Sequence, residues 1–111
     1  MDTLAQYRQI IQAVLLIYTK IPYAHGSIQC KPVFDVERDS YVLLTEGWDG
    51  SKRIHGCLVH IEIIHDKVWV QRDEIDSGIT YDLVHAGIPK SAIVLGFQEA
   101  SVRPFTEYAT A

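Results

Sequence analysis

The sequence predicts an α+β fold, in which an N-terminal helix and a short second helix pack on one face of a four- to five-stranded antiparallel sheet. Three observations support this prediction. Residues 3–21 carry apolar side chains at helical spacing, residues 40–73 alternate between apolar and polar with tight-turn signals between the runs, and residues 79–86 form a second short amphipathic segment. A single domain over residues 1–111 suits this length.

The first helix is predicted over residues 3–21. Its apolar positions follow the i, i+3, i+4, i+7 pattern of one buried face: Leu4, Tyr7, Ile10, Ile11, Val14, Leu15 and Tyr18. Asp2 or Thr3 can cap its N-terminus. Pro22 should end the helix, because a residue that precedes proline avoids helical backbone angles.

The strands follow from alternation and turns. Residues 23–31 are predicted as a loop that leads into an extended segment around residues 33–36, and residues 40–48 as the next strand. Asp49-Gly50 is a strong turn signal before a strand over residues 53–64. His65-Asp66 is then predicted as a two-residue turn into a strand over residues 67–73.

The second helix is predicted over residues 79–86, with Ser77 or Asp76 as its cap. Ile79, Leu83 and Val84 should face inward, and Gly87 stands where a helix C-cap glycine belongs. Residues 93–97 are predicted as a further strand, and the tail from residue 100 has aromatic residues without a clear period.

Composition narrows the possible partners and setting. The formal net charge is −4 and the ten basic residues are scattered, with only Lys52 and Arg53 adjacent, which argues against direct binding to nucleic acid. Direct DNA binding through Lys52, Arg53 and their neighbours stays open as a third possibility, if the fold gathers the basic residues on one face. The apolar runs are too short to cross a membrane, so we expect no membrane association. The opening residues lack a basic stretch, and the two cysteines, Cys30 and Cys57, form no CxxC pair. We therefore expect no secretory signal and a cytoplasmic setting.

Three histidines, His55, His60 and His65, raise the question of a metal site. On a hairpin that turns at residues 65–66, His55 and His65 share a face but lie about 33 Å apart, and His60 points to the opposite face. One ion holds its ligands at about 2 Å, so this run should not form a metal site. The sequence indicates no other cofactor.

The same hairpin predicts a core face and an outer face. Cys57, Val59, Ile61 and Ile63 should pack in the core with two residues of the next strand, so Cys57 is expected to be a buried, inert thiol. The outer face should place His60 opposite Gln71 and Glu62 opposite Trp69.

Two interpretations of this outer face remain open. His60 and Glu62 within reach of each other could act as a general acid/base pair. Alternatively, the face is a subunit interface with Trp69 as its anchor, which an aromatic side chain on a polar face favours. No phosphate-binding loop or nucleophile elbow accompanies the pair, so we expect an interface and a homo-oligomer rather than an active site.

Several segments resemble the XisI family in order along the whole chain: MDTLAQYRQIIQ, GWDGSKRIHGCLVHIEI, KVWVQRD, LVHAGIPKSAIVLGF and VRPFTEYATA. The chain departs from that family's habits at Glu62, where Asp is common, and at His65-Asp66, where Asn-Gly is common. Neither departure disturbs the predicted fold. The positions that match the family's motifs, and that we take as binding candidates, are Trp48, Asp49, Gly50, Arg53, His60, Trp69 and Gln71, and we add Glu62 from the outer face.

The resemblance implies a function without catalysis. XisI is the controlling factor for excision of the fdxN element of cyanobacteria, and it acts with a second, endonuclease-like protein, XisH, so that the recombinase XisF can excise that DNA. The resemblance therefore implies an accessory factor that binds an XisH-type partner and is not an enzyme. The alternative is a small ligand-binding protein or enzyme that uses His60 and Glu62.

Overall fold

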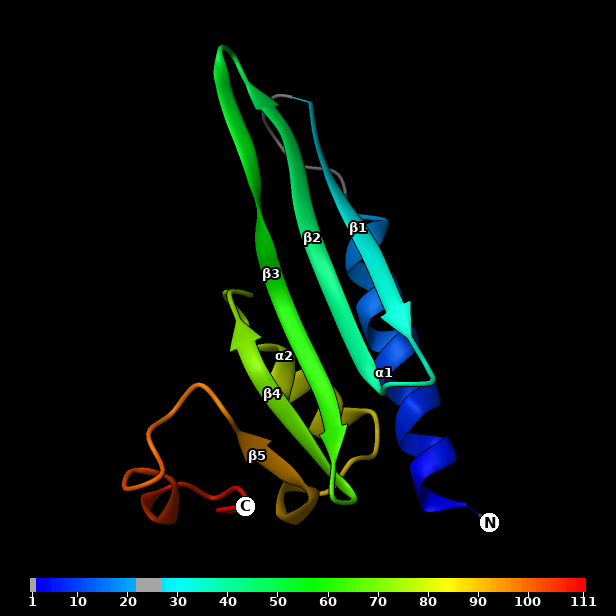
Figure 1. Ribbon diagram of the computed structural model, residues 1–111, viewed down its shortest axis with the longest axis vertical. Helices are drawn as coiled ribbons and strands as arrows, with labels where there is room; N and C mark the ends of the chain where they lie inside the picture. The colour runs from blue at the N-terminus through cyan, green and yellow to red at the C-terminus, as the bar shows by residue number, and fades with distance from the viewer. Residues whose placement is uncertain (1, 22–26) are drawn as a thin grey trace.

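The computed structural model describes residues 2–21 and 27–111 of the chain (Figure 1). Its helices are α1 (Thr3–Thr19) and α2 (Ile79–His85), and two short 3-10 turns, η1 (Lys90–Ala92) and η2 (Arg103–Phe105), lie near the C-terminus. Its strands are β1 (Ser27–Asp35), β2 (Ser40–Asp49), β3 (Lys52–Ile64), β4 (Lys67–Asp73) and β5 (Ile93–Leu95). No helix in the described ranges is long and apolar enough to cross a membrane.

The strands form one sheet in the order β1-β2-β3-β4-β5. The first four strands are antiparallel, as predicted, but β5 runs parallel to β4, so the sheet is mixed. The reason lies in the connection: the chain leaves β4, forms α2 and returns to the edge of β4, and such a helical crossover joins parallel strands. The α+β class is confirmed.

Both helices cover the same face of the sheet, which lies behind the strands in Figure 1. Tyr7, Ile11, Val14 and Leu15 are the buried residues of α1, so the predicted apolar face is confirmed. From the sheet, the core receives Tyr41, Leu43, Val59, Ile61, Val68 and Val70, and from α2 it receives Ile79 and Leu83. We call the opposite side of the sheet, which neither α1 nor α2 covers, the open face.

The hydrogen bonds at the helix ends show which residues cap each helix. The Asp2 side chain accepts a hydrogen bond of 3.0 Å from the Leu4 backbone N–H, so Asp2 caps α1. At α2 the prediction of Ser77 or Asp76 is wrong: Gly78 stands at the cap position without a side-chain hydrogen bond. Asp73, at the end of β4, accepts from the Ile79 N–H instead, at 3.0 Å. Pro22, the predicted end of the first helix, lies outside the described residues, and α1 ends at Thr19.

The β2–β3 hairpin extends beyond the helices as an arm, drawn at the top of Figure 1. We define this hairpin arm as residues 45–56. Strand β1 begins at Ser27, earlier than the predicted loop allowed, and its first residues support the arm. The backbone of Ser27 approaches Gly47 so closely that a Cβ at Gly47 would lie 1.9 Å from the Ser27 carbonyl oxygen. Gly47 also has a φ of 152°, so the packing of β1 against the arm requires glycine.

Candidate functional site

A polar cluster occupies the lower half of the open face, where β2, β3 and β4 lie side by side. His60 Nε2 lies 3.0 Å from Ser40 Oγ and 3.9 Å from Glu62 Oε1. Gln71 Nε2 donates a hydrogen bond of 3.2 Å to the same Glu62 oxygen. Three of the predicted outer-face residues therefore form one connected network, and Ser40 is an additional member.

The geometry of this network does not match that of a catalytic triad. In a triad, the base receives the nucleophile's proton at one ring nitrogen while a carboxylate orients the other nitrogen. Here Ser40 and Glu62 both approach the same atom, His60 Nε2, and neither orients Nδ1. The His60 and Glu62 side chains are each about one-third exposed, so water reaches them. The arrangement suits hydrogen bonding to a ligand better than activation of a serine.

The described residues also contain no group of three or more His, Cys, Asp or Glu side chains that could hold a metal ion. The strand register separates two of the three histidines of the run: His55 pairs with Glu46 near the arm, and His60 pairs with Val42 lower in the sheet. His65 stands in the two-residue turn, with a φ of 49°.

The predicted pairing of His60 with Gln71 is wrong by one residue. The register between β3 and β4 runs as predicted from the turn to Ile61 and Val70, and then His60 pairs with Arg72. Gln71 is the extra residue of a β-bulge in β4, and a bulge of this kind cannot be read from alternation, which assumes one residue per step. Gln71 still reaches Glu62 because the two lie on the same face.

A second bulge overturns the prediction for Cys57. Leu43 pairs with Val59 but Leu44 pairs with Cys57, so Leu58 is an extra residue in β3. Leu58 packs against the core, whereas Cys57 is only half-buried and stands outside the core cluster. Partial burial raises the pKa of the Cys57 thiol, so the protonated form predominates at neutral pH and the thiol is a poor nucleophile there.

Trp69 lies on the open face, as predicted, but it is half-buried rather than exposed. The guanidinium carbon of Arg103 lies 5.1 Å from the centre of the Trp69 ring, a cation–π contact. Gly96 passes so close that a Cβ there would lie 3.2 Å from the Trp69 ring and 2.4 Å from Gln71 Oε1. The C-terminal segment, residues 96–109, therefore covers part of the surface that the sequence predicted to be free.

The other binding candidates gather at the end of the hairpin arm. Trp48 pairs with Arg53 across the hairpin, and the Arg53 guanidinium carbon lies 5.3 Å from the centre of the Trp48 ring. Arg53 also donates to the Gly47 carbonyl at 3.3 Å. Asp49 ends β2, Gly50 and Ser51 form the turn, and Gly50 has a φ of 62°. Trp48, Asp49 and Arg53 are all exposed.

The candidate residues thus fall into two groups on one sheet. The arm group contains Trp48, Asp49, Gly50 and Arg53, and the network group contains His60, Glu62, Trp69 and Gln71. Sequence reasoning missed Ser40, because counting from the Asp49–Lys52 pair puts it opposite Ile61 on the core face, and only the extra residue Leu58 moves it opposite Glu62 on the open face. It also missed Arg103, because nothing in the tail's sequence indicates that it folds back over Trp69.

These features define a small α+β protein with a polar, hydrogen-bonding open face and a protruding hairpin arm. The chain belongs to the XisI family, whose model, described as XisI protein, matches residues 1–110. Two solved structures from Anabaena variabilis are similar to it over almost its whole length. A XisI-like protein is 30% identical with a TM-score of 0.90, and the match covers 98% of this chain and 100% of that one.

The second similar structure is the fdxN element excision controlling factor XisI. It is 33% identical to this chain with a TM-score of 0.83, and the match covers 99% of this chain and 100% of that chain. Comparison with curated proteins gave no match. The family and the α+β fold are therefore shown, and the name of the second structure describes a controlling factor rather than a catalyst.

Proposed function

We propose that this chain is an accessory factor that controls programmed excision of a DNA element by binding an XisH-type, endonuclease-like partner rather than by its own catalysis. The observation that carries this proposal is the geometry at His60. Ser40 and Glu62 approach the same ring nitrogen, and among the described residues no group orients the other, an arrangement that favours recognition over catalysis. A structural neighbour named as an excision controlling factor supplies the biological role.

Charge supports the choice of partner. A protein of net charge −4 can complement a basic, DNA-binding partner, which accelerates association and can block or present the partner's DNA site. The exposed Trp48–Arg53 pair supplies residue types that are enriched at the energetic centres of interfaces. The role as a partner subunit in the cytoplasm, without direct contact to DNA, remains part of this proposal.

Light scattering coupled to size-exclusion chromatography tests the proposal on the chain alone and after co-expression with an XisH-type protein. A stable mixed complex is the expected result, and two proteins that elute separately at micromolar concentration would contradict it. The mass of the chain alone tests the further proposal of a homo-oligomer, since a monomer at all concentrations would reject that part.

Two matched variants locate the binding surface. Trp48→Ala removes an aromatic ring that is 49% exposed on the arm, whereas Tyr81→Ala removes a ring that is 64% exposed on α2, on the helical side of the molecule. We expect Trp48→Ala to weaken the complex by about tenfold or more, as hot-spot aromatics do, and Tyr81→Ala to leave it unchanged. Equal effects of the two variants would show that the arm is not the binding surface.

A second candidate function rests on the hydrogen-bond network of Ser40, His60, Glu62 and Gln71. Four polar side chains that converge on one face could orient a small polar ligand. Under this alternative, His60→Ala and Glu62→Ala alter ligand binding or activity while the partner complex forms normally. If both variants leave every activity and affinity unchanged, the alternative is rejected.

A further inference from the structure

Among the described residues, β1, β5 and the part of β3 that runs past β4 each lack a neighbouring strand on one side, and the first two carry features that hinder the addition of a strand. Strand β1 is a true edge, but Pro32 in its middle removes a backbone donor. Strand β5 is covered by the C-terminal segment, where the Ala109 N–H donates to the Ile93 carbonyl at 2.8 Å and Ala109 bridges to Val94. The third place is the part of β3 that runs past β4.

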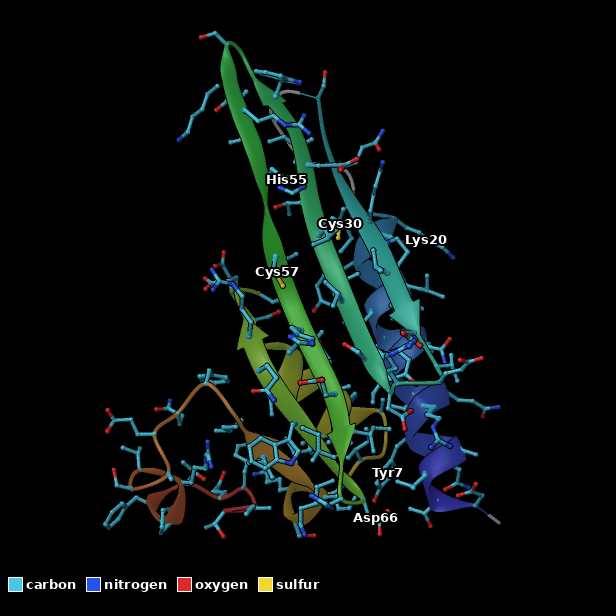
Figure 2. All side chains as sticks on the ribbon, in the orientation of Figure 1. Tyr7, Lys20, Cys30, His55, Cys57 and Asp66 are labelled. Carbon is cyan, nitrogen blue, oxygen red and sulfur yellow. The ribbon has the colours of Figure 1, made fainter. Side chains whose placement is uncertain are left out.

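Strand β3 has 13 residues, but β4 pairs only with Val59–Ile64. Beyond that point the Glu74 N–H donates to the Leu58 carbonyl at 2.9 Å, and β4 has ended. Among the described residues, no strand lies on the outer side of residues 52–57, where Figure 2 labels His55 and Cys57. We call residues 52–57 the free edge.

The free edge presents backbone groups ready for pairing. In an antiparallel strand, the N–H and C=O groups of alternate residues point to opposite sides. The hairpin closes at Asp49 and Lys52, so Lys52, Ile54 and Gly56 pair with β2, and Arg53 and His55 point their backbone groups outward. Residues 52–57 contain no proline, which is one of the usual devices that protect an edge from added strands.

The charges along the free edge select an acidic segment. Lys52, Arg53 and His55 belong to the free edge, and Arg72 closes its lower end by donating to the Cys57 carbonyl at 2.9 Å. Lys52 and Arg53 form no ion pair with any carboxylate in the described residues. Asp49, the cross-strand partner of Lys52, lies nearest to it without forming an ion pair, and Glu46, the partner of His55, is engaged by Lys31.

A second copy of the chain fits this edge poorly. Full antiparallel overlap of two free edges would drive the turn of each copy into Glu74 of the other, because Glu74 already occupies the outer side of Leu58. If two copies paired over a shorter stretch, so that Glu74 did not clash and side chains of the same face stayed together, Arg53 of one copy would lie opposite Arg53 or His55 of the other. Like charges opposite each other destabilise a strand pair. A separate extended segment has no hairpin turn to clash with Glu74 and no basic residue that must face Arg53, so it meets neither obstacle.

We propose that the free edge binds an extended, acidic segment of a partner protein, which adds to the sheet as a strand beside β3. Backbone hydrogen bonds to Arg53 and His55 would supply the pairing, and carboxylates on alternate residues would meet the Arg53 and His55 side chains, which share the open face. This names a binding mode for the partner of the proposed function, but a free peptide tests it independently of any XisH-type protein.

Fluorescence anisotropy with two labelled octapeptides tests the inference directly. One alternates glutamate with valine and the other alternates lysine with valine, so both favour extended structure and differ only in charge. We expect the acidic peptide to bind at least about tenfold more tightly than the basic one at low salt, with the difference reduced at high salt. No binding of either peptide at millimolar concentration, or equal binding of both, would overturn the proposal.

Two variants of His55 separate the contribution of its backbone N–H to peptide binding from that of its side chain. His55→Pro removes the outward N–H while leaving the β2 side of the strand intact, and His55→Ala keeps the N–H but removes the imidazole. Binding of the acidic peptide should fall by about tenfold or more in His55→Pro and by no more than about threefold in His55→Ala. Equal affinities for the two variants, with unchanged circular dichroism, would contradict strand addition.

Hydrogen exchange on the unmodified chain tests the same proposal without any effect of a substitution on the fold. The Arg53 and His55 amides should exchange rapidly in the free protein and become protected when the acidic peptide binds, whereas the Ile54 amide should be protected throughout. Peptide binding without protection of Arg53 and His55 would place the peptide elsewhere. A single-stranded oligothymidylate that protects these amides in place of the peptide would also reject the proposal and favour nucleic acid as the occupant.

Discussion

Arg8 on α1 and Asp39, between β1 and β2, form a two-point ion pair. Arg8 Nε donates to Asp39 Oδ1 at 2.7 Å, and Nη2 donates to Oδ2 at 3.1 Å. Tyr41 adds a third hydrogen bond to Asp39 Oδ1 at 3.1 Å, and Asp39 holds a φ of 52°. The side chains are mostly shielded from solvent, so this contact ties the helix to the β1–β2 connection more firmly than a surface ion pair would.

The Asp39→Asn variant should therefore be less stable at neutral pH, with a Tm lowered by about 5 °C. The substitution keeps the shape of the side chain but removes the charge that Arg8 pairs with. Thermal unfolding followed by circular dichroism measures the change. The exposed Asp76→Asn variant is the control and should unfold at the temperature of the unmodified chain.

The same pair predicts a pH dependence. The hydrogen bond from Arg8 holds the pKa of Asp39 below its ordinary value of 3.8, so the ionised form is favoured in the folded state. The stability that the carboxylate contributes is complete above about pH 4 and is lost as the pH falls through the lowered pKa. The difference in Tm between the chain and Asp39→Asn should stay constant from pH 7 to about pH 5 and shrink at lower pH. A difference that grows on acidification would contradict this account.

Tyr18 on α1 donates a hydrogen bond to Asp82 on α2 and thereby joins the two helices. Burial raises the pKa of the Tyr18 hydroxyl, so it stays protonated and able to donate well above neutral pH. Tyr18→Phe should lower the free energy of unfolding by about 1 kcal/mol, measured by urea denaturation. Combined with Asp82→Asn, it should show a loss smaller than the sum of the two single losses, whereas strict additivity would argue against a shared hydrogen bond.

Gly47 and Gly50 offer a matched pair of glycines on the arm. Gly47→Ala places a Cβ 1.9 Å from the Ser27 carbonyl oxygen, whereas Gly50 has no atom within 4 Å of such a Cβ. We expect Gly47→Ala to destabilise the fold by about 3 kcal/mol or more, because backbone must move. Gly50→Asn should cost far less, since asparagine tolerates a φ of 62°. Similar losses in the two variants would show that β1 does not pack against the arm as described.

Arg103 holds the C-terminal segment over Trp69. Its Nε donates to the carbonyls of Leu95 and Gln98 at 3.3 and 3.1 Å while its guanidinium covers the indole ring. Arg103→Ala should expose Trp69 and shift its fluorescence to longer wavelength, measured in a Trp48→Phe background so that one tryptophan reports. Arg103→Lys should restore the emission only in part, because lysine lacks the planar fork. An unchanged spectrum in Arg103→Ala would show that the segment does not depend on this contact.

Local patterns were sufficient to predict the elements of the fold. Helical spacing identified the buried face of α1, and the tight turn at His65-Asp66 fixed the register of β3 and β4 as far as Ile61. The parallel placement of β5 was missed because an apolar run of three residues carries no information about direction. That direction is set by α2, which returns the chain to the far edge of β4.

The candidate site was predicted less completely, for a different reason. Alternation assumes one residue per step, and the extra residues break that assumption twice: Leu58 in β3, the strand of His60, and Gln71 in the neighbouring β4. Contacts made by residues distant in sequence were also invisible: Arg103 is 34 positions from Trp69 (103 − 69), and neither residue type marks the other as its neighbour.

The extra residue Leu58 has a consequence for how the chain tolerates change in length. It sits between the part of β3 that belongs to the body of the protein and the part that belongs to the arm, and it resets which way every earlier residue of β3 points. Deleting that one position would place Cys57 directly beside Val59 in a regular ladder, with Cys57 still opposite Leu44 and Arg53 and His55 still on the open side. The orientation of the arm is thus fixed by its pairing with β2, so loss of the extra residue would remove the contact of Leu58 with the core and leave the exposed chemistry of the arm unchanged.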